Sequence, residues 1–154
     1  MVFRLERGST GFRDARGRAL TRVEPTLFRA VCFAAAREAG GRLSEVAPAT
    51  RRTFHSATVT EEHGRRLTVL CHAHLPLIAF TEGPVPPGDP VPGFAPVPVW
   101  SDPFRTAGFR LLEADELATP MTRADVTALA STELAEIGYH QPERAGDALF
   151  NWWD

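Results

Sequence analysis

The chain has 154 residues, of which 44% are hydrophobic, and a formal charge of −2 at pH 7. This length suits one domain with a substantial core, and the charge gives no reason to expect nucleic acid or an anionic membrane as a partner. All 17 basic residues are arginine, so a lysine base or a lysine Schiff base is excluded.

The amino-terminal part predicts two strands and then a helix. Residues 2–7 alternate between apolar and charged side chains, and residues 18–23 can return as a second strand after a turn. From Pro25 onward, apolar residues recur at helical spacing until the Gly40-Gly41 pair, which ends a helix.

Further features of the sequence concern the cellular location of the protein and the state of its cysteines. The amino terminus lacks the apolar stretch of a signal peptide. The longest apolar run, Ala30 to Ala36, is too short to cross a bilayer. Cys32 and Cys71 lie in apolar contexts without the spacing of a metal or redox pair. We therefore expect a cytoplasmic protein with two buried, free thiols.

Two strand-forming runs between residues 51 and 80 are joined by a polar turn that ends in glycine, which predicts a β-hairpin. Strand alternation divides the second run into two faces. One face is wholly apolar and is expected to face the core: Leu67, Val69, Cys71, Ala73 and Leu75. His72 and His74 share the opposite face.

The position of His55 depends on the length of the hairpin loop. A two-residue loop sets His55 opposite His72, and a four-residue loop sets it opposite Leu70, on the same face. A three-residue loop moves His55 to the other face. Two of these three registers therefore gather His55, His72 and His74 on one side of the hairpin.

Three imidazoles on one face can hold a divalent metal such as zinc with one open position, or serve as a metal-free acid–base site. His55, His72 and His74 are thus the candidate catalytic residues and the candidate metal ligands. No aspartate or glutamate lies in the same strands to orient these imidazoles by accepting a hydrogen bond from a ring N–H. The competing interpretation, with no metal or other cofactor, is a sheet surface that carries neutral histidines.

Between Pro84 and Pro98, seven of fifteen residues are proline. This density disfavours strand pairing and favours an extended, rigid chain. The pieces on either side are too small for two cores, so we expect residues 84–100 to form a long surface loop rather than a linker. Phe94 and Trp100 within it are expected to lie against the body or a partner.

The remaining chain predicts a strand at Phe109–Glu113 and a helix that begins near Thr122 and ends at Gly138. Residues 146–154 favour a strand, with a short helix as the alternative. In a strand, Trp152 and Trp153 would point to opposite faces, leaving one of them outward as a possible interface anchor.

Together these elements predict a single α+β domain over residues 1–154. We expect a mainly antiparallel sheet of about five to six strands. Two helices would pack on one face, and the other face would be open or covered by the proline-rich loop.

Sequence motifs for nucleophilic catalysis and phosphate binding are absent, and Cys71 cannot reach the adjacent His72 because neighbouring strand residues point apart. The leading hypothesis is a non-catalytic domain that binds another protein, such as a bacterial immunity protein or another inhibitor of a toxin or enzyme. The residues expected to bind the partner are His72, His74, Phe94, Trp100 and Trp153. The alternatives are a metal-dependent hydrolase or lyase centred on the three histidines, and a pocket for an apolar small molecule.

Overall fold

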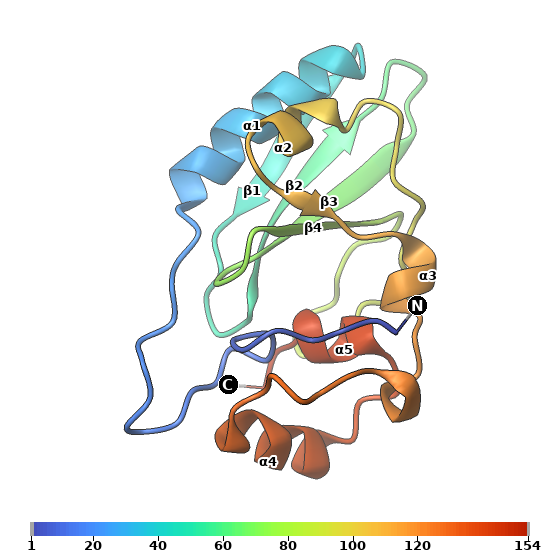
Figure 1. The fold of residues 1–154 in the computed structure, drawn as a ribbon. Coiled ribbons are helices and arrows are strands. Elements are labelled where there is room, and N and C mark those ends of the chain that lie inside the picture. Colours follow the sequence, from blue (N-terminus) through green and yellow to red (C-terminus); the bar gives the residue numbers. More distant parts are fainter. Residues whose placement is uncertain (1, 154) are drawn as a thin grey trace.

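The computed structural model describes residues 2–153, which form one α+β fold around a five-stranded sheet (Figure 1). The strands follow one another in space as they do in sequence: β1 (Arg42–Ala47), β2 (Phe54–Thr60), β3 (Arg66–His72), β4 (Leu77–Thr81) and β5 (Arg110–Leu111). The first four pair antiparallel, and β5 pairs parallel to β4. The expected class and the mainly antiparallel sheet are confirmed.

Helix α1 (Pro25–Glu38) has the predicted start and end, and it packs on one face of the sheet beside α2 (Asp102–Thr106). Phe28 and Cys32 of α1 are fully buried in the same cluster as Val69 of β3. Gly41 is required where α1 turns into β1, because a Cβ there would lie 1.7 Å from the carbonyl oxygen of Thr60. Both cysteines are buried and free, as expected.

The second face of the sheet is covered too, by helices and the amino-terminal segment in addition to Val91 of the proline-rich loop, where the sequence predicts an open face or the loop alone. The amino-terminal segment, α3 (Ala114–Leu117) and α5 (Ala145–Leu149) pack there, with α4 (Ser131–His140) outside them (Figure 1). Helices therefore lie on both faces rather than on one. The cause is local: β2 and β3 bury side chains on both sides, since Phe54 and Leu70 are as inaccessible as Val69.

Several expected strands differ from the structure. Residues 2–7 form only one bridge, between Arg4 and Asp125, and residues 18–23 are not a strand. Strand β1 was not anticipated, because Arg42–Ala47 is an exposed edge strand with little apolar patterning. The segment predicted as a carboxy-terminal strand contains α5, the short-helix alternative, followed by extended chain to Trp153.

The helix predicted from Thr122 begins later, at Ser131. The Asp125 carboxylate accepts hydrogen bonds from the backbone and hydroxyl of Thr127, which closes a turn instead of capping a helix. The backbone of Asp125 also pairs with Phe3 and Leu5. Tertiary pairing with the amino-terminal segment therefore overrides the local capping pattern.

Residues 82–101 contain no helix or strand, in keeping with their proline content. The segment lies against both cores: Val91 packs in the cluster of the second face, and Ala95 and Trp100 pack in the cluster of the α1 face. The Trp100 indole donates a hydrogen bond to the Glu61 carboxylate at 2.7 Å. Within residues 2–153, no helix has the length and apolar character needed to span a membrane.

Candidate functional site

The β2–β3 register decides whether the three histidines share a face. His55 pairs with Cys71, and Phe54 pairs with His72. This is the three-residue-loop register, with Gly64 at φ +92° in the last loop position and Glu61 and Arg65 bonded across the loop. His55 therefore faces α1 and His72 faces the opposite side, so the three histidines do not gather on one face.

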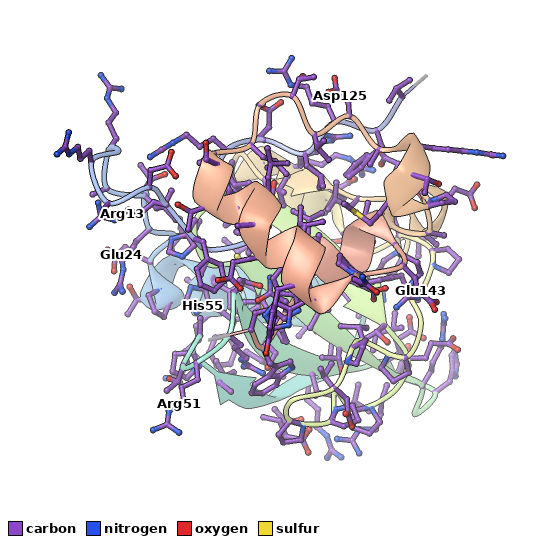
Figure 2. The ribbon with its side chains drawn as sticks, turned by 90° about the horizontal axis from the view of Figure 1, so that it is seen from below. Arg13, Glu24, Arg51, His55, Asp125 and Glu143 are labelled. Atoms are coloured by element: carbon purple, nitrogen blue, oxygen red, sulfur yellow. The ribbon has the colours of Figure 1, made fainter. Side chains whose placement is uncertain are left out.

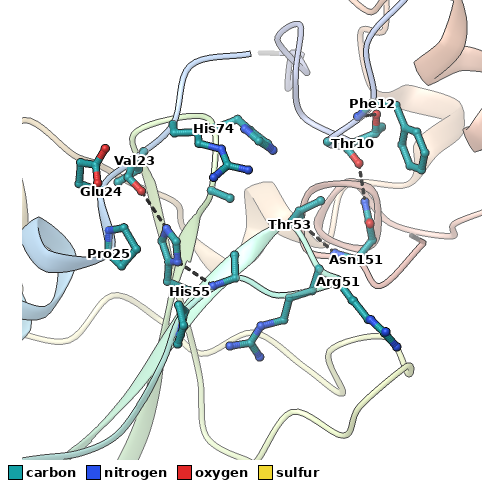
Figure 3. A pocket seen from close by; sticks show the side chains of 16 residues that line it. Thr10, Phe12, Val23, Glu24, Pro25, Arg51, Thr53, His55, His74 and Asn151 are labelled. Atoms are coloured by element: carbon teal, nitrogen blue, oxygen red, sulfur yellow. Dashed lines mark hydrogen bonds between the residues drawn. The ribbon is translucent and has the colours of Figure 1, made fainter. Parts of the chain in front are cut away.

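Both ring nitrogens of His55 hold the backbone of other segments. Nδ1 accepts a hydrogen bond from the Ala49 N–H at 2.8 Å, and Nε2 donates to the Val23 carbonyl at 2.9 Å (Figure 3). The ring stacks on Phe28 of α1. Burial lowers the pKa of His55, and the neighbouring charge of Arg52 lowers it further. A neutral His55 thus ties the chain before α1 to the chain before β2.

His72 has the same structural role on the other face. Its Nε2 donates to the Ser9 carbonyl at 2.7 Å, and its Nδ1 accepts from the N–H groups of His74 and Leu75 at 3.1 and 3.2 Å. The ring is fully buried. Burial lowers the pKa of His72 to about 4. No lone pair of His55 or His72 is left for a metal ion.

His74 is the most accessible of the three. Its Nδ1 bonds the Thr21 carbonyl at 2.9 Å, and its ring centroid lies 5.9 Å from that of His72. Among residues 2–153, no three side chains of His, Cys, Asp or Glu are placed to hold a metal ion. The hydrogen bonds of these rings give the histidines a structural role.

The molecule has two hollows at the end of the sheet where β2 begins. The first, of about 320 Å³, is lined by His55, His74 and three arginines and is named here the arginine hollow (Figure 3). The second, of about 660 Å³, lies between residues 88–92, 140–144 and 150–153 and is named the C-terminal groove. Asn151 lines both of them.

Asn151 positions the chain between the two hollows. Two hydrogen bonds join Asn151 to Thr53. The Thr53 N–H donates to the Asn151 carbonyl, and the Asn151 N–H donates to the Thr53 hydroxyl. Its side-chain amide donates to the carbonyls of Thr10 and Ala148, and its Oδ1 accepts from the Trp153 N–H. This buried network fixes both tryptophans relative to β2.

Aromatic rings line part of the C-terminal groove. Trp153 stacks on His140, with centroids 4.5 Å apart and planes inclined by 7°. Trp152 packs edge-on against Phe54 and beside Arg52. The Nε1–H of Trp152 is buried and has no hydrogen-bond partner among residues 2–153.

Prolines and acidic residues also line the C-terminal groove. Pro90, Pro92 and Pro142 line it. Arg144 is neutralised by Asp147, whereas the groove residues Asp89 and Glu143 are exposed and form no ion pair within residues 2–153. The groove therefore combines aromatic rings with unneutralised carboxylates.

The residues expected to bind a partner lie in different environments. Trp153 lines the groove, and Phe94 lies half-buried against Phe150 and Arg144 beside it. His74 is half-exposed at the arginine hollow. His72 and Trp100 are buried and present no surface.

Sequence reasoning missed His140, Arg52 and Asp89. No local motif marks them, and only the Arg51-Arg52 pair, placed directly before a strand, is a visible signal.

Comparison with known proteins gives no further guidance, since no protein-family model, curated protein or solved structure matches the chain. The structure is that of an α+β domain with two neighbouring hollows.

Proposed function

We propose that this protein is a non-catalytic binding protein whose C-terminal groove holds an extended segment of another protein. The observation that carries the proposal is a groove of about 660 Å³ lined by Trp152 and Trp153 together with two exposed carboxylates, Asp89 and Glu143. Tryptophan is among the residue types enriched at binding hot spots.

The charges of the groove suggest the chemistry of the bound segment. Asp89 and Glu143 carry negative charge that no cation of residues 2–153 neutralises through an ion pair. The indole of Trp153 offers a face to a cation. The segment we propose is therefore extended and carries an arginine or lysine that reaches the two carboxylates.

An inhibitor or immunity role fits such a protein, because covering a basic segment of an enzyme or toxin blocks its use. The groove walls support this role, since prolines lose little conformational freedom on binding. The metal-dependent hydrolase is not proposed further, because both nitrogens of His55 and of His72 are engaged with the backbone.

The test is selection of a displayed library of random twelve-residue peptides on the protein, followed by NMR of the selected peptide bound to it. We expect enrichment of arginine and lysine, and a shift of the Trp152 and Trp153 indole N–H signals as the peptide covers the groove. The Trp100 indole is an internal control, because it is already bonded to Glu61. The double substitution Asp89→Asn and Glu143→Gln should weaken peptide binding about tenfold.

The matched control is Glu62→Gln, an exposed carboxylate in the β2–β3 turn at the opposite end of the sheet. It should leave peptide binding unchanged. Peptides that bind the double variant as tightly as the native protein would contradict the proposal. So would peptides that move the Trp100 signal and leave the Trp152 signal in place.

A further inference from the structure

The arginine hollow gathers positive charge around a confined space. Arg22, Arg51, Arg52 and His74 line it, and the only acidic lining residue is Glu24. None of the three arginines forms an ion pair with a carboxylate of residues 2–153. Arg22 and Arg51 are exposed and Arg52 is half-buried, so three guanidinium groups are available to an anion that enters the hollow.

Arg52 is the fixed cation of the hollow. Its Nη2 donates to the Ala47 carbonyl at 3.2 Å and to the Ser56 hydroxyl at 2.9 Å, and its guanidinium lies 4.4 Å from the centroid of the Phe54 ring. The Trp152 ring lies 5.2 Å from it. These contacts hold the group half-buried, while Nη1 and Nε donate to no acceptor of residues 2–153. A held guanidinium with free donors matches the geometry of an oxyanion.

Arg51 places a second guanidinium at the rim. Its backbone adopts φ +59°, a left-handed conformation that is unfavourable for a residue with a side chain. Its side chain is exposed. Arg51 and Glu24 lie on opposite sides of the hollow in Figure 3, and in Figure 2 Glu24, His55 and Arg51 are all labelled on the left of the view. Glu24 therefore does not occupy the position of a counter-ion for Arg51.

The charges that line the hollow also act on the pKa of His55. After burial, the positive charges of Arg52, His74 and Arg22 further lower the pKa of His55. The volume of about 320 Å³ lies at the lower end of ligand pockets, which run from roughly 300 to 1,000 Å³. It suits a small anion rather than a dinucleotide.

We infer that the arginine hollow is a second binding site, separate from the C-terminal groove, that takes a small oxyanionic ligand of the phosphate-monoester or dicarboxylate type. Arg52 holds one oxyanion group from a fixed position, and Arg51 and Arg22 close on it from the rim. The apolar wall of Val23, Pro25 and Pro48 contacts the carbon skeleton.

The test is isothermal titration of the protein with inorganic phosphate, with malonate and with chloride, at constant ionic strength. We expect saturable binding of phosphate or malonate and none of chloride, which lacks oxygens in fork geometry. Arg51→Gln should weaken the binding about tenfold, because a hydrogen bond to a charged group is lost. Phosphate binding alone would identify a phosphate monoester as the ligand class, and malonate binding alone would identify a dicarboxylate.

The control is Arg105→Gln on α2, an exposed arginine paired with Asp102 outside the hollow. It should bind phosphate or malonate like the native protein. Arg22→Gln provides a second test at an exposed position and should also weaken the binding. Absence of saturable binding of both oxyanions, or an equal loss of affinity in Arg105→Gln, would overturn the inference.

Discussion

The buried histidines and the buried indole of Trp152 are two opposite ways of placing a polar side chain inside this molecule. Every ring nitrogen of His55 and His72 is hydrogen-bonded to the backbone, whereas the Trp152 Nε1–H has no acceptor within residues 2–153. A satisfied polar group stabilises the fold and is not free for chemistry. An unsatisfied one lowers the stability of the fold.

The largest expected effect comes from deleting residues 152–154. The deletion removes the indole that packs on Phe54 and the one that stacks on His140. Loss of a packed tryptophan typically costs about 3–5 kcal/mol, so the free energy of unfolding in urea should fall by about 4 kcal/mol. An unchanged urea midpoint would show that the carboxy-terminal rings belong to the groove alone and not to the core.

Acid should destabilise the protein through His72. The pKa of His72 is about 4 in the folded protein, whereas a histidine in an unfolded chain has a pKa of about 6.5. Between these two pKa values the unfolded chain binds more protons than the folded protein. The contribution of neutral His72 to the free energy of unfolding is therefore fully present above pH 6.5. It falls as the pH drops toward 4, by at most about 3 kcal/mol. Unfolding at pH 7.5, 5.5 and 4.5 measures this slope.

The variant His72→Gln separates His72 from the other groups. It should be less stable at pH 7.5 and should have a flatter pH dependence between pH 6.5 and 4, with His55 present in both proteins. An equal slope in the variant would assign the acid sensitivity elsewhere.

A paired tryptophan substitution tests the comparison directly. Trp100→Phe removes an indole that donates to Glu61, and should cost about 1–2 kcal/mol from the lost bond to a charged group. Trp152→Phe removes an indole N–H with no acceptor, so apart from the smaller ring it should change stability by less than about 1 kcal/mol. Equal losses in thermal unfolding would show that the Trp152 indole is satisfied in solution.

Two glycines provide the smallest effects, with opposite signs. Gly64→Ala places a side chain at φ +92°, in the loop that sets the β2–β3 register, and should cost about 1 kcal/mol. Gly138→Ala lies within α4, with nothing within 4 Å of the added Cβ, and should stabilise by about 1 kcal/mol. Thermal unfolding of both variants measures the pair, and a stabilising Gly64→Ala would contradict the role given to the loop.

Part of the candidate site was readable from the sequence. The clustering of His55, His72 and His74 near one end of the hairpin was visible, and so was the aromatic carboxy terminus. The sequence left open the β2–β3 register, which decides the face on which His55 lies. Gly64 in the last loop position is nevertheless a signal for a three-residue loop. The role of Arg52 was not readable, because Phe54 and Trp152 meet it only in the folded chain.

Elements with local patterns can be predicted from the amino-acid sequence alone. The start of α1 at Pro25, its end before Gly40 and the burial of Cys71 follow from helical spacing, strand alternation and glycine. The helices on the second face of the sheet, and the hydrogen bonds to both ring nitrogens of His55 and His72, depend instead on contacts between distant segments. The partners of the two histidines include Val23 and Ser9, which lie 32 and 63 residues away in sequence, and no local pattern can specify contacts of that range.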